Sequence, residues 1–316
     1  MTGTLQDMMG EPGEFKLELV RGGSWELASR PALMGILNCT PDSFSDGGQY
    51  SDSAEAVAAA CRMVEDGADV VDVGGESTRP GADPVSLEEQ LDRVIPVIRG
   101  IRQSSPVLVS IDTRDPRVGR AALEAGADIV NDVSACEDPG WIPVLKEFSC
   151  PVIVMHMRGT PASMQEDTAY PAGVVNEVCE YLEGRIEALD ASGISPERII
   201  VDPGIGFAKE AVQNIELLGG LRQLSDLGRP VLFGASRKFF LGKILGDSSG
   251  RGRDPAERDI ATVAANMVAV LQGASILRVH NVPYTRDLLD VAEALRLDSG
   301  QGVALDALQG SGGGGA

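Results

Sequence analysis

The chain has 316 residues, of which 43% are hydrophobic and 23% charged, a composition typical of a globular protein with a large core. Its 47 acidic and 27 basic side chains give a formal charge of −20, which argues against nucleic acid or an anionic membrane as a partner, because both bind positively charged surfaces. Five scattered cysteines without a C-x-x-C pair, and an N-terminus without an apolar segment, predict a reduced, cytoplasmic protein with no signal peptide.

The N-terminal part of the chain predicts a β-hairpin, because residues 14–28 contain two short strand-like segments around Gly22 and Gly23. After it, short apolar segments alternate with segments of helical periodicity. Strands are predicted at 32–37, 70–73, 107–111, 129–131, 152–155, 199–201, 231–233 and 276–279. Helices are predicted near 53–66, 86–102, 116–125, 139–148, 172–192, 213–227, 257–272 and 284–297.

Three segments of the sequence resemble one another: EDGADVVDVGGE, EAGADIVNDVSA and LQGASILRVHNV. Each predicts a helix that ends at a left-handed glycine and leads directly into a buried strand. Strands that are apolar on both faces are typical of parallel sheets covered by helices. Eight successive β-α units therefore predict a single (β/α)8 TIM barrel at 14–297, with the N-terminal hairpin closing the barrel floor. We expect residues 1–13 to be flexible and residues 298–316 to be a Gly-rich flexible tail.

Polar residues follow almost every predicted strand at its C-terminal end, where such barrels build their active sites. They are Asn38, Asp112, Asn131, Asp132, His156, Asp202, Ser236, Lys238, Arg278 and His280. The loops at 40–48 and 74–81 combine Gly, Pro, Ser and charge, which is typical of functional loops. Basic residues gather on this rim (Arg79, Lys238, Arg278 and His280), and in so acidic a protein they predict an anionic ligand, with phosphate the best fit.

The order of the sequence blocks resembles that of the dihydropteroate synthases, a pterin-binding family of TIM barrels. The blocks are ILNCTPDSFSDGG, DVGGESTRPG, SIDT, NDVS, MHMRGTP, DPGIGF, SRK and RVH, and the resemblance covers about 32–297. The sequence departs from the family pattern at Cys39 (usually Val), Ala208 (usually Gly), Glu210 (usually Thr) and Asn281 (usually Asp). Glu210 could change the charge of a pocket loop, and Asn281 could change the orientation or pKa of His280.

The resemblance implies that 6-hydroxymethyl-7,8-dihydropterin pyrophosphate reacts with 4-aminobenzoate to give 7,8-dihydropteroate and pyrophosphate, by an SN1-like substitution. It implies a pterin site at Asp112, Asn131, Met155, Asp202 and Lys238. Carboxylates there would accept from the N–H groups of the pterin, and the lysine would donate to its carbonyl. Two local alternatives remain open: Asp112 could be the N-cap of the helix that begins at Pro116, and Asp202 could be a turn residue before Pro203.

The remaining roles also come from the resemblance. Pyrophosphate would be bound by Asn38, Arg278 and His280, and Mg²⁺ by Asn38 together with the phosphates of the substrate. Aminobenzoate would be bound by Thr78, Arg79, Pro80, Phe207 and Ser236. Closure of the first loop would involve Phe44 and Ser45, and the chemistry is assigned to Asp46, Asp112 and Lys238. Arg278 could instead form only a salt bridge, and His156 is left out of the site because a structural role is equally plausible.

Two other functions remain as alternatives. A pterin-dependent methyltransferase would share the pterin site but would need no pyrophosphate site. A folate-binding protein without turnover would keep the pocket, although no proposed catalytic position is substituted. The resemblance further implies a homodimer that acts on small molecules only.

Overall fold

The computed structural model describes residues 14–27, 30–40, 49–77, 84–160, 163–164, 167–247 and 250–297. Its parallel strands are β3 (Ala32–Asn38), β4 (Val70–Gly74), β5 (Leu108–Asp112), β6 (Ile129–Asp132), β7 (Val152–Met155), β8 (Ile199–Asp202), β9 (Leu232–Phe233) and β10 (Ile276–Val279). They pair in the order β8-β7-β6-β5-β4-β3-β10-β9. A parallel bridge between Val201 and Val231 joins β8 to β9, so the predicted barrel closes.

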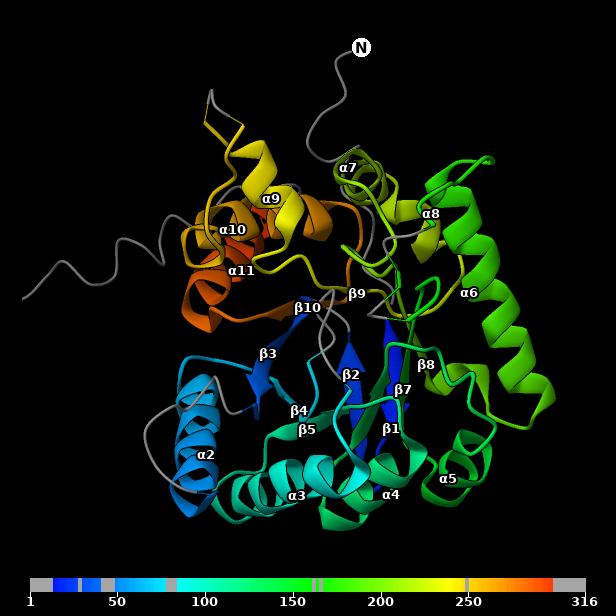
Figure 1. Ribbon diagram of the computed structural model, residues 1–316, viewed down its shortest axis with the longest axis vertical. Helices are drawn as coiled ribbons and strands as arrows, with labels where there is room; N and C mark the ends of the chain where they lie inside the picture. Colours follow the sequence, from blue (N-terminus) through cyan, green and yellow to red (C-terminus); the bar gives the residue numbers. More distant parts are fainter. Residues whose placement is uncertain are drawn as a thin grey trace, which may run out of the picture.

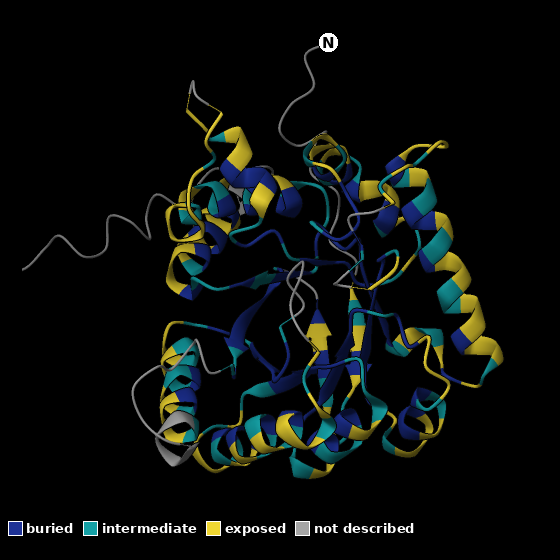
Figure 2. Ribbon diagram, in the orientation of Figure 1, coloured by how far each residue is buried: buried dark blue, intermediate teal, exposed yellow. Residues whose placement is uncertain are grey.

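Helices surround this ring of strands (Figure 1). They are α2 (Gln49–Glu65), α3 (Leu87–Ser104), α4 (Pro116–Ala125), α5 (Trp141–Phe148), α6 (Val174–Ala191), α7 (Ala211–Gly219), α8 (Leu221–Ser225), α9 (Phe239–Ile244), α10 (Asp259–Leu271) and α11 (Val282–Leu297), with 3-10 turns at Pro196–Arg198 and Pro255–Glu257. The strands are buried, while the outer faces of the helices are exposed (Figure 2).

The structure differs from the helical predictions at two places. The single helix expected at 213–227 is divided at Gly220, where a Cβ atom would lie 2.7 Å from a methyl carbon of Val175 on α6, so the two helices approach through a position without a side chain. The short helix α9 was not predicted at all, because six residues are too few to display a helical period.

The N-terminal hairpin consists of β1 (Phe15–Glu18) and β2 (Ser24–Leu27), which pair antiparallel. Leu17, Trp25 and Leu27 pack against a layer of apolar side chains at the start of the barrel strands: Val70, Ile129, Ile153, Ile200, Leu232 and Ile276, with Ala32 and Met34. The hairpin therefore closes the barrel floor, as the sequence predicts.

The three repeated sequence segments share one structural device. The residue after Gly-Ala donates its backbone N–H to the carbonyl of a residue on the preceding strand, and its side chain accepts from the N–H of that same residue. Asp69 pairs in this way with Leu33, Asp128 with Val109 and Ser275 with Val231. We call these three pairs the strand clamps, and they lie at the N-terminal ends of the strands.

Two strand clamps also attach neighbouring segments through arginine. Asp128 is fully buried and pairs with Arg21 of the hairpin turn and with Arg102 at the end of α3. Asp69 pairs with Arg30, which lies just before β3. The clamps therefore join the hairpin, α3 and the sheet at the N-terminal end of the barrel strands.

Further predictions about the chain concern its cysteines, its membrane spans and its termini. All five cysteines have no disulfide partner. Among the described residues, no helix is both long and apolar enough to cross a membrane. The flexible segments expected at 1–13 and 298–316 lie outside the described residues.

Candidate active site

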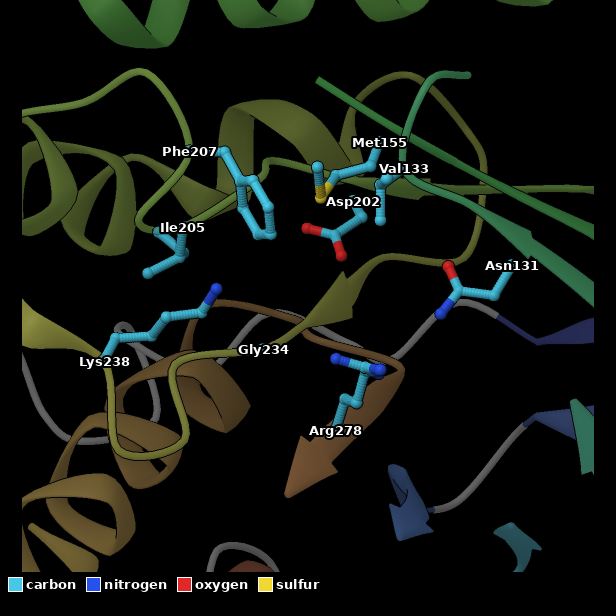
Figure 3. A pocket seen from close by; sticks show the side chains of 9 residues that line it. All are labelled: Asn131, Val133, Met155, Asp202, Ile205, Phe207, Gly234, Lys238 and Arg278. Carbon is cyan, nitrogen blue, oxygen red and sulfur yellow. The ribbon is translucent and has the colours of Figure 1, made fainter. Parts of the chain in front are cut away.

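On several strands, an apolar side chain of the floor layer is followed two residues later by a polar side chain that also points into the barrel. Strand side chains two residues apart point to the same side, so Asp72 lies above Val70, Asn131 above Ile129, Asp202 above Ile200 and Arg278 above Ile276. A pocket opens above the apolar layer. Its lining is Asn131, Val133, Met155, Asp202, Ile205, Phe207, Gly234, Lys238 and Arg278 (Figure 3).

Five sequence-predicted site residues share this pocket with Arg278. They are the pterin candidates Asn131, Met155, Asp202 and Lys238, and the aminobenzoate candidate Phe207. Figure 3 shows the polar ends of Asp202, Lys238 and Arg278 converging on the space between them, with the ring of Phe207 and the sulfur of Met155 beside Asp202. Residues from β6, β7, β8 and β10 therefore line one cavity.

Arg278 is paired with two buried carboxylates. Its Nε donates to Asp72 Oδ2 at 2.6 Å, and one terminal nitrogen donates to Asp112 Oδ2 at 2.6 Å. The salt bridge that the sequence left as an alternative is thus present, and Arg278 lines the pocket as well. Asp72 was missed by the sequence analysis.

One guanidinium cannot neutralise both carboxylates. Burial raises the pKa of Asp112 well above its usual range, against the opposing effect of Arg278, while Asp72 raises it further. Among the described residues, Asp72 Oδ1 and Asp112 Oδ1 are buried without a hydrogen-bond partner. Arg278, which lines the pocket, is therefore held by two buried carboxylates that lie outside the pocket lining and each keep one unused acceptor.

The local alternatives for two aspartates have different outcomes. The N-cap of α4 is Asp115, which accepts from the N–H of Arg117, so Asp112 is not the helix cap. Asp202 does serve as a turn residue, since its Oδ1 accepts from the N–H of Gly204 at 2.7 Å. Burial raises the pKa of Asp202, and the Gly204 hydrogen bond and Lys238 oppose that shift.

Lys238 and Phe207 form one wall of the pocket. The Lys238 ammonium lies 4.0 Å from the centre of the Phe207 ring, within the range of a cation–π contact. Ser236, from the same loop as Lys238, has its hydroxyl 2.9 Å from Nδ1 of His280 and accepts from the His280 backbone N–H at 3.1 Å. A predicted aminobenzoate residue and a predicted phosphate residue are therefore hydrogen-bonded to each other.

Asn38 ends β3 beside Gly74 of β4, which in turn is paired with Asp112 of β5. It is half-buried at the same end of the barrel as the pocket. The predicted residues Phe44, Ser45, Asp46, Thr78, Arg79 and Pro80 lie outside the described residues.

Departures from the family pattern have local consequences. Ala208 has a φ of 52°, in the left-handed region that favours glycine. Glu210 is exposed and caps α7 in a capping box with Gln213, so it does not line the pocket. Asn281 donates to Asp259 and accepts from the N–H of Tyr284 at the start of α11, whereas the His280 ring contacts Ser236. Cys39 is buried, which raises its pKa to about 12.

A second missed residue, Lys209, lies buried directly behind the pocket loop. Its ammonium contacts His156 Nδ1 at 2.9 Å and the carbonyl oxygens of Phe207 and Gly204 at 3.0 and 3.1 Å. His156 is therefore a structural hydrogen-bonding residue outside the pocket lining. The sequence offers no local signal for Lys209, which looks like an ordinary surface lysine before a helix.

The chain is similar to known proteins over nearly the whole barrel. Residues 34–280 match the family model described as pterin binding enzyme. The chain is 46% identical over 272 residues to the dihydropteroate synthase of Synechocystis sp., covering 86% of this chain and 92% of that protein.

The chain is also similar to solved structures of dihydropteroate synthases. A structure of Xanthomonas albilineans dihydropteroate synthase with 4-aminobenzoic acid superimposes with a TM-score of 0.82 at 43% identity, covering 90% of this chain and 99% of that one. A structure of the enzyme from the same organism with 7,8-dihydropteroate gives a TM-score of 0.78 at 40% identity, covering 89% and 98%.

The chain therefore belongs to the family of pterin-binding enzymes. Within that family it has the function of the dihydropteroate synthases, which are transferases, and the relatives named above are all synthases rather than methyltransferases.

Proposed function

We propose that the described pocket is where the chain joins 6-hydroxymethyl-7,8-dihydropterin pyrophosphate to 4-aminobenzoate. The observation that carries this assignment is the convergence of Asn131, Asp202, Lys238 and Arg278 on one cavity, with Phe207 on its wall. A pterin has a flat ring with N–H donors on one edge and a carbonyl nearby, and this set of acceptors and donors matches it.

Asp202 and Asn131 each keep an acceptor for the ligand after the internal contacts described above. Asp202 uses Oδ1 for Gly204, which leaves Oδ2 to accept from the pterin. Asn131 donates its amide nitrogen to Asp72 at 3.2 Å, so its amide oxygen accepts from the ligand. Lys238 donates to the ring carbonyl, and Phe207 packs against the aminobenzoate ring.

The pairing of two carboxylates with one Arg278 fits an SN1-like substitution. When the C–O bond to pyrophosphate breaks, the electron pair leaves with pyrophosphate, and positive charge spreads over the dihydropterin. Asp112 then stabilises that charge electrostatically. Arg278, His280 and Asn38 bind the departing anion, and the neutral amine of aminobenzoate attacks the methylene carbon and afterwards releases a proton.

The residues present fit Mg²⁺ only together with substrate phosphates. Among the described residues there is no cluster of three His, Cys, Asp or Glu that could hold an ion alone, while Asn38 offers one amide oxygen at the rim. Mg²⁺ commonly takes one or two protein ligands, with phosphates and water completing its shell. When bound, the ion neutralises charge on the leaving pyrophosphate. Calorimetry should show that Mg²⁺ tightens binding of the pterin pyrophosphate but leaves binding of the pterin alcohol unchanged.

Pyrophosphate release is the direct test of the proposed function. The full chain, supplied with dihydropterin pyrophosphate, Mg²⁺ and 4-aminobenzoate, should release pyrophosphate and form dihydropteroate in equal amounts. Omitting aminobenzoate should stop product formation. A chain that binds both substrates without releasing pyrophosphate would be a binding protein, and the proposal would be wrong.

The chain also exposes apolar side chains on neighbouring helices, which supports the expected homodimer. Among the exposed apolar side chains are Val212 and Ile215 on α7, Ile260 and Val268 on α10, and Tyr284 and Val291 on α11, and α10 packs against both other helices. A surface of this kind is typical of an interface. Light scattering should give twice the chain mass, and Ile260→Glu should give a folded monomer. A wild-type monomer at micromolar concentration would contradict the dimer.

The five unpaired cysteines support a reducing, cytoplasmic location.

A further inference from the structure

Lys209 is buried in a position that satisfies its ammonium completely. Its side chain is directed behind the loop that follows β8, and the residue is only 4% exposed. The ammonium has three N–H donors and no acceptor. Three short contacts, to His156 Nδ1 and to the carbonyls of Gly204 and Phe207, use all three donors, and the His156 carbonyl is a fourth, longer contact at 3.4 Å.

This geometry requires an uncharged His156. Because Nδ1 accepts from Lys209, the ring carries its proton on Nε2. Burial and the charge of Lys209 lower the pKa of His156 to about 2, so the ring stays neutral. The ring packs edge-on against Tyr181, with ring centres 5.0 Å apart. His156 is therefore a fixed acceptor for the ammonium rather than a proton donor to the substrate.

The loop held by Lys209 connects two pocket residues, Asp202 at its start and Phe207 near its end. Its backbone is packed tightly: Gly204 has a φ of 68°, and a Cβ atom there would lie 1.9 Å from the His156 carbonyl oxygen. Asn214 holds the loop from α7 by accepting from the N–H of Gly206 at 2.6 Å. Lys209 is the charged side chain that donates to the loop carbonyls of Gly204 and Phe207, while the Asp202 carboxylate accepts from the N–H of Gly204.

We propose that Lys209 is a positioning residue for the aminobenzoate half of the reaction, which it serves by fixing the Gly204–Phe207 loop and hence the Phe207 ring. The same charge, buried near Asp202, helps to keep that carboxylate ionised. This inference rests on the proposed function, since it assumes that Phe207 contacts aminobenzoate.

The charge of Lys209 is sensitive to pH near neutrality. Burial lowers its pKa to about 7, Asp202 on β8 opposes that shift, and Lys238 and Arg158 add to it. Tyr170 and Tyr181, which pack against His156, stay neutral because burial raises their pKa. A neutral amine has two N–H donors for three acceptors, so one contact to the loop is lost as the pH rises.

The test is the pH dependence of aminobenzoate use by the full chain at saturating dihydropterin pyrophosphate and Mg²⁺. Between pH 6 and pH 9.5, kcat/KM for aminobenzoate should fall with rising pH through an increase in KM. Lys209→Met should lower kcat/KM by roughly ten- to a hundredfold at pH 6.5, the size expected for losing a charged hydrogen bond. It should also remove the alkaline decline.

Lys146→Met, at an exposed lysine on α5, is the matched control and should keep the wild-type profile. An alkaline decline that persists in Lys209→Met belongs to another group and overturns the inference. Thermal unfolding shows whether that variant folds. If it does not fold, the wild-type dependence of kcat/KM on pH is the test, and a flat dependence overturns the inference. Activity with a flat profile leaves the proposed function standing, whereas no pyrophosphate release at any pH contradicts the function itself.

Discussion

The two buried carboxylates that pair with the pocket residue Arg278 are costly for the stability of the fold. Asp72 and Asp112 are both buried, share Arg278 as a partner, and each keep one oxygen without a hydrogen bond among the described residues. Removing an ion from water costs free energy that a shared partner only partly restores. Such an arrangement is useful if the reaction develops positive charge, because the compensating charge then arrives with the transition state.

Replacing Asp112 by Asn should therefore separate stability from activity. The folded-state pKa of Asp112 is raised, so ionisation costs stability progressively as the pH rises from the unfolded pKa through the folded one. At pH 8 we expect Asp112→Asn to be more stable by about 1–2 kcal/mol, with little gain at pH 4 and a strongly reduced kcat. Thermal unfolding at both pH values measures this, and a lower melting temperature at pH 8 would show that the Asp112 charge stabilises the fold through Arg278.

Asp202 should be essential for pterin binding in a way that surface carboxylates are not. Asp202→Ala leaves pterin N–H donors without acceptors, at about 1–3 kcal/mol each. Calorimetry with the pterin alcohol should then show a large loss of affinity, while Asp190→Ala on the exposed face of α6 should bind as the wild type does. Unchanged affinity in Asp202→Ala would remove this residue from the pterin site.

The sequence predicted which residues gather at the pocket where that place follows from a position at or just after the end of a strand. Asn131, Asp202, Lys238 and Arg278 all follow from that rule. Asp72 could have been predicted by the same rule, because it points into the barrel two residues after Val70. Its partner Arg278 is 206 residues away, and pairing over that distance depends on how the barrel closes. The burial of Lys209 could not be predicted from the sequence, since it depends on the path of a loop.

At the scale of elements, the strand clamps explain why three segments repeat. The repeated Gly-Ala-Asp or Gly-Ala-Ser ends a helix, with Gly67, Gly126 and Gly273 in the left-handed conformation, and then ties the next strand to its neighbour. The sequence predicted the helix ends and the strands from this repeat. It could not show the clamps, because they need the partner strand in register.

The charged and uncharged clamps should differ in strength. Asp128→Ala leaves Arg21 and Arg102 with no carboxylate at that buried site, so we expect a loss of about 3–5 kcal/mol. Ser275→Ala removes only a neutral hydrogen bond and should cost about 0.5–1.5 kcal/mol. Thermal unfolding of both variants tests the ranking. The folded fraction of each should keep wild-type kcat, since the clamps lie at the floor, and equal losses of stability would contradict the role of charge.

At the scale of the whole molecule, the barrel has two ends with different tasks. Apolar packing, the hairpin and the clamps, with the buried Asp128 among them, occupy one end, and the pocket with Asp202, Lys238 and Arg278 occupies the other. The chain has a net charge of −20, yet two basic side chains, Lys238 and Arg278, line the pocket. The places of these residues after the predicted strands indicated that basic side chains gather at this end of the barrel, but not that Arg278 is paired with two buried carboxylates.

The hairpin under the barrel has a kinetic consequence, because a pocket with a sealed floor has a single mouth. Whatever binds deepest must arrive first and depart last, so the chain should follow an ordered sequence: pterin pyrophosphate in, aminobenzoate in, pyrophosphate out, dihydropteroate out. Product inhibition distinguishes this order from a random one. Dihydropteroate should compete with pterin pyrophosphate and act non-competitively towards aminobenzoate, while competition with both substrates would mean that either can occupy the empty barrel first.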